Sequence, residues 1–306
     1  MLGVTPSPWE FQPHPEVWLL LGGLTAAYVY MVKVLGPRAV PPGQPPVTRT
    51  QVALFSVSMV VLWIASDWPV HDIGERDLYW VHMVQHLLLS YVLPPLFLLA
   101  TPEWLLRTLI GTGRLQRVVR WLTQPVVAAV GFNAIVILTH IPGVVNESAT
   151  NAVLHYTLHV ALVTMSILYW MPVCGPLPEY RLAPGPKMIY LFAASIIPTV
   201  PAGWLAFAEG SVYNVYDVPD RAFSMSVTTD QQLAGVIMKI GGSLYMWTII
   251  TVIFFRRFMA GWEQQQSFRR ATRVPDSEIV GHAERPLTFD EVSREFEKVP
   301  PPREPD

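Results

Sequence analysis

Seven long apolar segments constrain this chain more than any other feature of its sequence. A helix that crosses the hydrocarbon layer of a bilayer needs about 20 mainly apolar residues, and each segment meets or approaches that length. The segments are residues 17–35, 51–67, 78–99, 124–141, 153–171, 187–207 and 232–255. The fourth is the weakest, since it is short and contains Asn133 and Thr139. The sequence therefore predicts an all-α, polytopic membrane protein built as a bundle of seven transmembrane helices.

Lysine and arginine are distributed unevenly over the loops, and this predicts the orientation of the bundle. The chain has 21 lysines and arginines. Only Arg76 and Arg221 fall in the loops on one side, and Lys239 falls inside the seventh segment. Cytoplasmic loops of membrane proteins carry the excess of basic residues. We therefore expect the N-terminus outside and the C-terminus in the cytoplasm.

Three regions follow from this pattern. Residues 1–16 form an extracytoplasmic N-terminal segment, residues 17–258 the seven-helix transmembrane domain, and residues 259–306 a cytoplasmic tail. The tail has many charges and few large hydrophobic side chains, so we expect it to be mainly disordered. Within it, Thr288-Phe-Asp-Glu291 fits a capping box and predicts a short helix that reaches Lys298.

Six of the eight histidines are expected in one layer near the outer face of the bundle. These are His71, His82, His86, His140, His155 and His159. His82 and His86 are spaced i,i+4, as are His155 and His159, so each pair places two imidazoles on one helix face. Imidazole is the commonest metal ligand, and ionisable residues are rare inside a membrane unless they serve a function. We predict a metal site with these four histidines as first ligands, and with His140 as a further candidate.

The seventh segment adds candidates for the same site. Met238 is expected at about the depth of His86, and a thioether suits Cu(I) as imidazole suits copper, zinc or iron. Gln231 lies seven residues before Met238, on the same helix face. Asp230 is placed to cap the seventh helix. We expect Asp67, Asp230 and Gln231 to hydrogen-bond to the ligand side chains and so to orient them toward the metal.

Other residues of the seventh segment concern helix packing. Gly235, Gly241 and Gly242 would let a neighbouring helix approach closely. Lys239 is the one basic residue placed inside the membrane, and such residues usually face the bundle interior.

The same residues allow other interpretations. A histidine pair near a helix end can hydrogen-bond to neighbouring helices without a metal. Met83 and Met225 are further candidates for thioether ligands, but they can also be packing or loop residues. Histidines on facing helices at matched depth can also ligate haem. The single cysteine, Cys174, excludes a multi-cysteine zinc or iron–sulfur site. It is expected on the cytoplasmic side, away from the histidines.

Three motifs in this layout resemble a known family. They are His82-Met-Val-Gln-His86-Leu-Leu-Leu, the pair His155 and His159, and Asp230-Gln-Gln-Leu-Ala-Gly-Val-Ile-Met238. Over about residues 15–258 the chain resembles the CtaG-type cytochrome c oxidase assembly factors of bacteria. It departs from the family pattern at Ala234, Lys239 and Leu158, close to the candidate site.

The resemblance implies a multi-pass protein of the bacterial plasma membrane that is needed to form active haem–copper oxidase. Its expected partners are oxidase subunits and the lipid bilayer, with no nucleic acid, and its expected cargo is copper. A protein of this kind turns over no substrate, so we do not expect an enzyme. Three other functions stay open at this point: a copper or cation transporter, a haem-binding electron carrier, and a metal-free scaffold for oxidase subunits.

Overall fold

The computed structural model describes residues 9–217, 223–271 and 288–298, whose regular structure is helical throughout. Six helices are long and apolar enough to cross a membrane, and a bent helix pair adds a seventh. The six are Pro15–Ala39, Arg49–Arg76, Tyr79–Ala100, Ala152–Cys174, Pro184–Ala206 and Val227–Phe268. The predicted fold class, an all-α polytopic bundle, is therefore confirmed.

These spans are assembled from shorter helices. In chain order they are α1 (Pro15–Tyr30), α2 (Gly36–Ala39), α3 (Arg49–Ser66), α4 (Val70–Arg76), α5 (Tyr79–Leu87), α6 (Leu93–Ala100), α7 (Glu103–Ile110), α8 (Arg114–Leu122), α9 (Pro125–Leu138), α10 (Pro142–Ser148), α11 (Ala152–Cys174), α12 (Pro184–Ala194), α13 (Thr199–Ala206) and α14 (Val227–Ala271). Two π-helical turns, η1 (Met31–Leu35) and η2 (Leu88–Val92), join α1 to α2 and α5 to α6.

The fourth predicted span differs from the others. Its transmembrane part is α9, whose 14 residues cover about 21 Å, less than the roughly 30 Å of hydrocarbon. The preceding α8 meets α9 at an angle of 72°. Along α8 the basic Arg117 and Arg120 alternate with the exposed apolar Val118 and Trp121, a pattern typical of helices that lie in the membrane interface.

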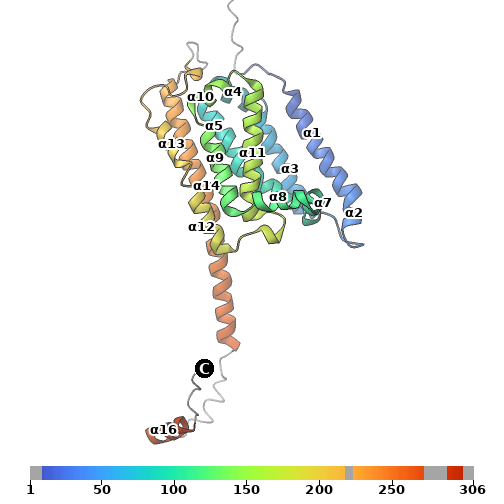
Figure 1. The fold of residues 1–306 in the computed structure, drawn as a ribbon, viewed down its shortest axis with the longest axis vertical. Helices are drawn as coiled ribbons and strands as arrows, with labels where there is room; N and C mark the ends of the chain where they lie inside the picture. The colour runs from blue at the N-terminus through green and yellow to red at the C-terminus, as the bar shows by residue number, and fades with distance from the viewer. Residues whose placement is uncertain (1–8, 218–222, 272–287, 299–306) are drawn as a thin grey trace, which may run out of the picture. The chain divides into compact units, whose positions relative to one another are not determined.

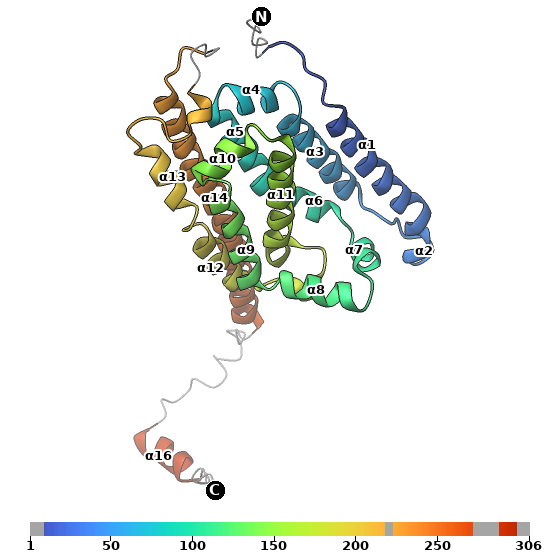
Figure 2. The same cartoon turned by 45° about the horizontal axis from the view of Figure 1, so that its top comes forward.

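The short helices close the two ends of the bundle. Figures 1 and 2 show α4 and α10 across one end and α7 and α8 across the other. In both views α1 lies at the edge, beside α3, with which it packs. We call the end with α4 and α10 the histidine end, because six histidines gather beneath it. That this end faces outward stays a prediction from loop charge.

Aromatic side chains fill the interior below the histidines. Phe132 of α9 stacks on Tyr169 of α11 with ring centroids 4.7 Å apart, and Tyr169 in turn stacks on Tyr190 of α12. The Tyr190 hydroxyl donates to the Tyr169 carbonyl at 2.8 Å, so the phenol keeps a partner where water is excluded. This core fixes α9, α11 and α12 against one another.

A proline in the third span leaves one backbone carbonyl without its helical hydrogen bond, and a side chain of another helix donates to that carbonyl. Pro94 has no backbone N–H, so the carbonyl of Ser90, four residues earlier, loses its helical partner. The indole Nε1 of Trp170 donates to that carbonyl at 2.9 Å. In a dry interior a backbone group without a partner is costly, so this bond ties α11 to the span that carries His82 and His86.

Asp230 connects the last span to the same helix. Its carboxylate accepts from the backbone N–H groups of Tyr79 at 3.0 Å and Trp80 at 2.9 Å, the first two residues of α5. A buried carboxylate at a helix N-terminus satisfies free N–H groups and complements the helix dipole. The sequence predicted a cap on the helix of Asp230 itself; these bonds instead cap α5.

The glutamines that follow Asp230 bind two further segments. The Gln231 amide accepts from Val212 N–H at 2.7 Å and donates to the Tyr213 carbonyl at 3.1 Å. The Gln232 amide donates to the Ala208 carbonyl at 3.0 Å. The Asp-Gln-Gln run thus fastens α14 to α5 and to the loop that follows α13.

Gly235 allows α13 and α14 to touch. A Cβ atom at this position would lie 2.6 Å from both the Ala202 carbonyl oxygen and the Ala206 nitrogen, well inside van der Waals contact. The close approach predicted for Gly235 is confirmed. Gly241 is tight in the same sense, with Leu87 at 3.0 Å, whereas Gly242 has ordinary contacts.

Lys239 does not face the bundle interior, so that expectation is wrong. Its side chain is exposed on α14, and its ammonium group donates to the Thr199 hydroxyl at 2.6 Å. A hydroxyl on the neighbouring helix gives the amine a polar partner without burial.

The first part of the predicted tail is not disordered. Helix α14 continues to Ala271, so residues 259–271, expected to be disordered, are helical. The short helix predicted after Thr288 is present as α16 (Phe289–Glu297), and Glu291 accepts from the Thr288 N–H at 3.0 Å as a capping box requires. Residues 1–8, 218–222 with Arg221, and the remaining tail residues 272–287 and 299–306 lie outside the described residues.

Gly235→Ala is expected to lower the thermal unfolding midpoint of the detergent-solubilised protein, because the new methyl group would overlap backbone atoms of α13. Overpacking of this kind typically costs about 1–3 kcal/mol. Gly22→Ala in α1 is the matched control, since nothing lies within 4 Å of its Cβ position. Removing a helical glycine there should be neutral or stabilising by up to about 1 kcal/mol. Equal effects of the two substitutions would contradict the close approach.

Candidate metal centre

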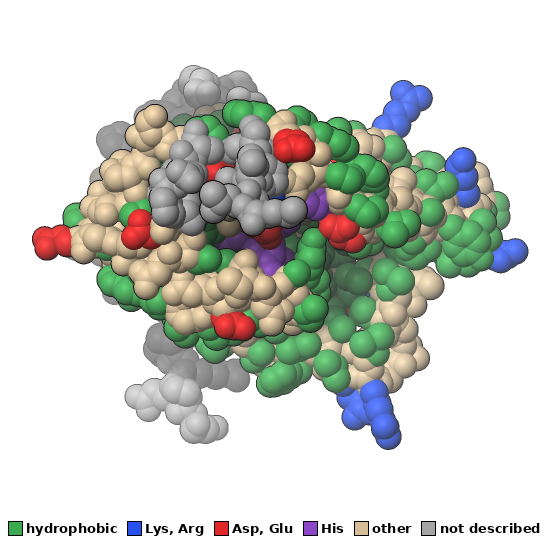
Figure 3. Space-filling model, turned by 90° about the horizontal axis from the view of Figure 1, so that it is seen from above, with side chains coloured by type: hydrophobic (Ala, Val, Ile, Leu, Met, Phe, Trp, Pro, Cys, Tyr) green, Lys and Arg blue, Asp and Glu red, His purple; other side chains and the backbone are tan. Residues whose placement is uncertain are grey.

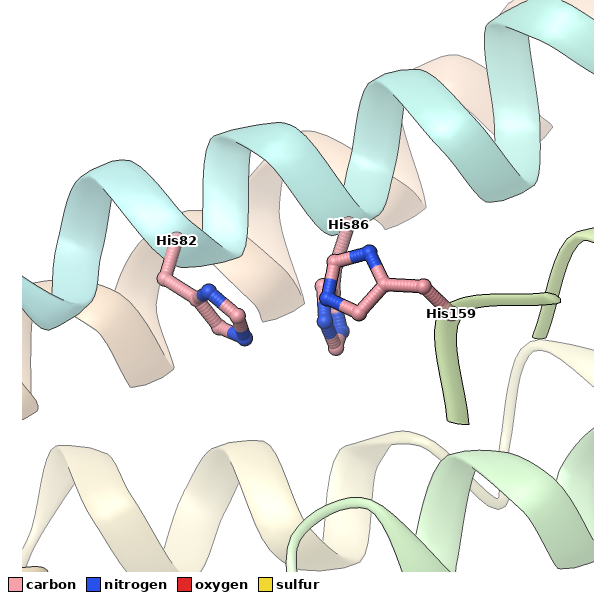
Figure 4. A group of neighbouring side chains, drawn as sticks. All are labelled: His82, His86 and His159. Carbon is pink, nitrogen blue, oxygen red and sulfur yellow. The ribbon is translucent and has the colours of Figure 1, made fainter. Parts of the chain in front are cut away.

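Three histidines from two helices converge beneath the histidine end. His82 and His86 lie one turn apart on α5, and His159 faces them from α11 (Figure 4). The ring centroids of His82 and His86 are 4.3 Å apart, and those of His86 and His159 are 5.0 Å apart. One ring nitrogen of each residue lies within 4.8 Å of the other two. We call this group the trihistidine cluster.

The chemistry of the trihistidine cluster fits a metal ion. His82 Nδ1, His86 Nε2 and His159 Nε2 are buried and have no hydrogen-bond partner within the described part of the chain. Buried polar atoms without partners are rare because each is costly. Bonds of about 2.0–2.1 Å from an ion to each nitrogen allow two such nitrogens to lie up to about 4.2 Å apart. Small side-chain rotations would therefore bring all three onto one ion.

His155 belongs to a second group, not to this one. Its Nε2 lies 2.7 Å from Glu75 Oε1, and the Nε2 of His71 lies 3.2 Å from the same oxygen. The Gln85 amide donates to His71 Nδ1 at 3.1 Å, which leaves the His71 proton on Nε2, facing Glu75. The structure thus divides the four predicted first ligands: three form the trihistidine cluster, while His155 pairs with Glu75.

The second group lies directly beside the first. The His155 and His159 rings are 4.4 Å apart, and His82 and His155 are 5.8 Å apart. The ligand atoms of His71, Glu75 and His155 also lie within 4.8 Å of one another, so a cation could be held here as well. We call these three residues the Glu75 cluster. Because Glu75 is about one third exposed, this cluster connects the buried histidines with the surface of the bundle end.

Two backbone features set the position of α5. Asp230 caps its first turn, and Gly74 of α4 packs against its backbone, where a Cβ would lie 3.1 Å from His82 N. A larger residue at Gly74 would push α4 away from α5. The close contact therefore keeps Glu75 and His71 near His82.

His140 and Met238 lie on the other side of His86. The ring centroids of His86 and His140 are 6.3 Å apart. His140, His86, Met83 and Met238 line one small cavity of about 30 Å³ between α5, α9 and α14. The prediction that Met238 reaches the depth of His86 agrees with this arrangement, and Met83, for which the sequence left open a thioether ligand or a packing residue, lines the same cavity. Met225 lies in the loop before α14.

The three predicted supporting residues hydrogen-bond to indole and backbone groups. The Asp67 carboxylate accepts from the indoles of Trp18 at 2.8 Å and Trp63 at 2.6 Å, and from the Trp68 N–H at 2.9 Å. Asp230 and Gln231 bind backbone groups, as described above. Asp67 therefore anchors α1 to α3, and the other two act on the ligands only through the helices and loops that they hold.

Two residues near the site were missed in the sequence. Glu75 stands four residues after His71, and this i,i+4 spacing is the signal that could have paired them. His14 carries no such signal: it precedes the first helix, yet its ring lies 5.0 Å from that of His71. Its Nε2 donates to Asp72 Oδ2 at 2.9 Å and its Nδ1 donates to Glu16 Oε1 at 3.1 Å. Only the tertiary structure places it here.

A larger apolar cavity leads from the histidine end into the bundle. It has a volume of about 410 Å³ and is bounded by α1, α3, α6 and α11, with Leu20, Leu62 and Val163 among its lining residues. At its polar end it reaches His71, His155 and His159. Figure 3, which looks onto this end, shows histidine surface near the centre and acidic side chains around it, while most lysines and arginines in view project at the periphery.

The chain matches one known family, described as cytochrome c oxidase caa3 assembly factor (Caa3_CtaG), over residues 26–259. The matched region runs from α1 into α14 and contains both clusters. It confirms the resemblance that the histidine pairs and the Asp-Gln-Gln run indicated. No curated protein and no solved structure gives a match.

The contacts of His14 predict a pH-dependent contribution to stability. Burial lowers the pKa of His14, but the hydrogen bonds to Asp72 and Glu16 outweigh it, so the pKa is raised above 6.5. A group whose pKa is higher in the folded protein than in the unfolded chain stabilises the fold fully at a pH below its unfolded pKa. This stabilisation is lost as the pH rises through the pKa of the folded protein. The thermal midpoint of the wild type should therefore exceed that of His14→Gln most at about pH 5.5 and least at about pH 8.5. A difference that does not vary with pH would contradict the charged contact.

Proposed function

Because the chain belongs to the cytochrome c oxidase caa3 assembly factor family, we propose that it delivers copper to the oxidase and binds the ion at His82, His86 and His159. The three partnerless nitrogens of the trihistidine cluster carry this proposal. Membership of the family supports a part in oxidase assembly, and the cluster supports copper as the cargo.

The surroundings favour copper over harder metals. Three imidazoles from α5 and α11 suit copper, zinc or iron, and the thioethers of Met83 and Met238 on the far side of His86 favour Cu(I). Within the described residues, neither of the two groups of metal-ligating side chains contains a cysteine. A site of neutral imidazoles adds no negative charge to the bundle interior, where charge is costly.

The Glu75 cluster gives the cargo a route to the buried site. Glu75 is partly exposed at the histidine end and contacts His71 and His155. A carboxylate attracts a cation from solvent, and His155 lies next to His159. Copper can thus pass from the partly exposed Glu75 to His155 and on to His159 from one polar ligand to the next.

The distribution of ligands favours delivery over transport across the bilayer. A transporter needs polar groups through the whole thickness of the membrane. In the described part of the chain, both groups of clustered ligands lie at the histidine end, and the core beneath them is aromatic. We therefore propose that copper enters and leaves at the same membrane face.

The proposed setting is the bacterial plasma membrane, in which this multi-pass bundle would meet newly made oxidase subunits. The protein binds and releases its cargo and turns over no substrate in this mechanism. Its own contribution is to hold three imidazoles neutral and dry until an oxidase subunit offers better ligands.

The double substitution His82→Ala with His86→Ala tests the proposal. Purified wild-type protein should contain nearly one copper or more per chain after anaerobic loading, measured by elemental analysis. Removing two ligands should weaken copper binding far beyond the 10- to 100-fold typical of lost outer partners. In cells, oxidase activity should fall while the variant still inserts into the membrane.

Thr157→Val is the matched control, because Thr157 is exposed on α11 between His155 and His159. It should keep both copper and oxidase activity. Normal oxidase activity in the histidine double variant would overturn the proposal. Iron with a Soret band would instead indicate haem, and loss of oxidase without any metal in the wild type would indicate a scaffold.

A further inference from the structure

We propose that the chain contains a second, Cu(I)-selective site formed by His140, Met83 and Met238, next to His86, whose neutral imidazole has one lone pair and can therefore bind an ion of this site or of the trihistidine cluster, one at a time. The proposal deepens the proposed function, on which it rests for the identity of the metal. It assigns ligands to a cavity distinct from the trihistidine cluster.

The hydrogen bonds of His140 determine which of its nitrogens is free. Nδ1 lies 2.7 Å from the Val136 carbonyl oxygen, which can only accept. The Thr139 hydroxyl, 3.3 Å from Nδ1, already donates its proton to the same carbonyl at 3.0 Å. The proton of a neutral imidazole must therefore reside on Nδ1, and Nε2 presents a lone pair.

That lone pair faces a sulfur atom. His140 Nε2 lies 3.4 Å from Met83 Sδ, and a thioether has no proton to donate. If Nε2 were protonated and donated to the sulfur, Nδ1 would be left facing a carbonyl oxygen, acceptor against acceptor. Two electron-pair donors that face each other in a buried site form a pair suited to a cation.

The spacing fits one ion between the two atoms. Bonds of about 2.0 Å to nitrogen and 2.3 Å to sulfur, set near the tetrahedral angle, place the ligand atoms about 3.5 Å apart. His140 is 4% exposed and Met83 is 1% exposed, so their positions are fixed by packing and neither is open to water.

The cavity beside this pair supplies further ligands. It measures about 30 Å³, above the roughly 10–15 Å³ that a single water requires. Met238 of α14 lines it, and so does His86. The lack of a side chain at Gly241, where a Cβ would lie 3.0 Å from Leu87 Cδ1, allows α14 to lie close to α5 beside Met238.

His86 connects the two sites. It lines this cavity and also the one formed by His82, His155 and His159. Imidazoles accept several metals, whereas a site with two thioethers selects Cu(I). An ion could therefore move from the trihistidine cluster to the methionines by exchanging ligands around His86, and remain Cu(I) throughout. The methionine site would then exclude zinc that the histidines admit.

The test is Cu(I) binding to the full-length protein in detergent, loaded anaerobically from a Cu(I)–chelator complex, with X-ray absorption at the copper edge. We expect about two Cu(I) per chain and a sulfur shell at about 2.3 Å. Met83→Leu with Met238→Leu, nearly isosteric changes, should lose one copper and the sulfur shell. His82→Ala with His159→Ala should lose one copper and keep that shell. Zn(II) should occupy one site in the wild type.

Met246→Leu is the matched control, since Met246 is 2% exposed and packs in the aromatic core but does not line this cavity; it should leave both copper ions and the sulfur shell unchanged. Selenomethionine-labelled protein without substitutions gives an independent measurement, in which copper should appear as a neighbour at the selenium edge. Absence of sulfur and selenium neighbours in the wild type would overturn the inference, as would a sulfur shell undiminished in the methionine double variant. The proposed first site is tested separately by His82→Ala with His159→Ala. If this variant loses no copper while the sulfur shell is present, the first site is overturned and the methionine site is supported.

Discussion

The structure depends on one constraint: inside a bilayer no water is at hand, so every buried polar group must find its partner within the protein. The chain meets a large part of this demand with contacts between distant segments. Trp170 binds the carbonyl that Pro94 leaves free, and Asp230 caps a helix from 150 residues away in the sequence. Each bond that satisfies a polar group also fixes one helix against another, so the demand for partners determines much of the packing.

Against this background the trihistidine cluster stands out. Its three ring nitrogens are buried and lack partners among the described residues. By contrast, the Ser90 carbonyl and the Tyr190 hydroxyl, which are also buried, both have hydrogen-bond partners. A site at which three such ring nitrogens converge within 4.8 Å of one another is suited to receive a cation. The Glu75 cluster differs because its two imidazoles lie within ion-pairing distance of a carboxylate that is about one third exposed.

The Asp-Gln-Gln run shows how a motif can position a candidate site through the backbone. Asp230, Gln231 and Gln232 hold α5 and the loop after α13 by hydrogen bonds to backbone groups. Asp230 acts on the candidate metal site by fixing the helix that carries His82 and His86. Gln231 does so less directly: it binds the backbone of Tyr213, whose hydroxyl donates to the His140 carbonyl at 3.0 Å. Motif residues in a membrane bundle can thus be required for function because they set helix positions.

The sequence by itself determined the helical class, the approximate spans, and the i,i+4 histidine pairs on α5 and α11, because hydrophobic length and helical periodicity are local properties. It also indicated that Met238 reaches the depth of His86, since depth follows from rise per residue. Only the tertiary structure decided that His155 turns to Glu75 while His159 joins His82 and His86, and that Asp67 binds tryptophans. It also decided that Met83 faces His140. These outcomes depend on how helices rotate and tilt against their neighbours, which side-chain packing across the bundle sets and no local pattern encodes.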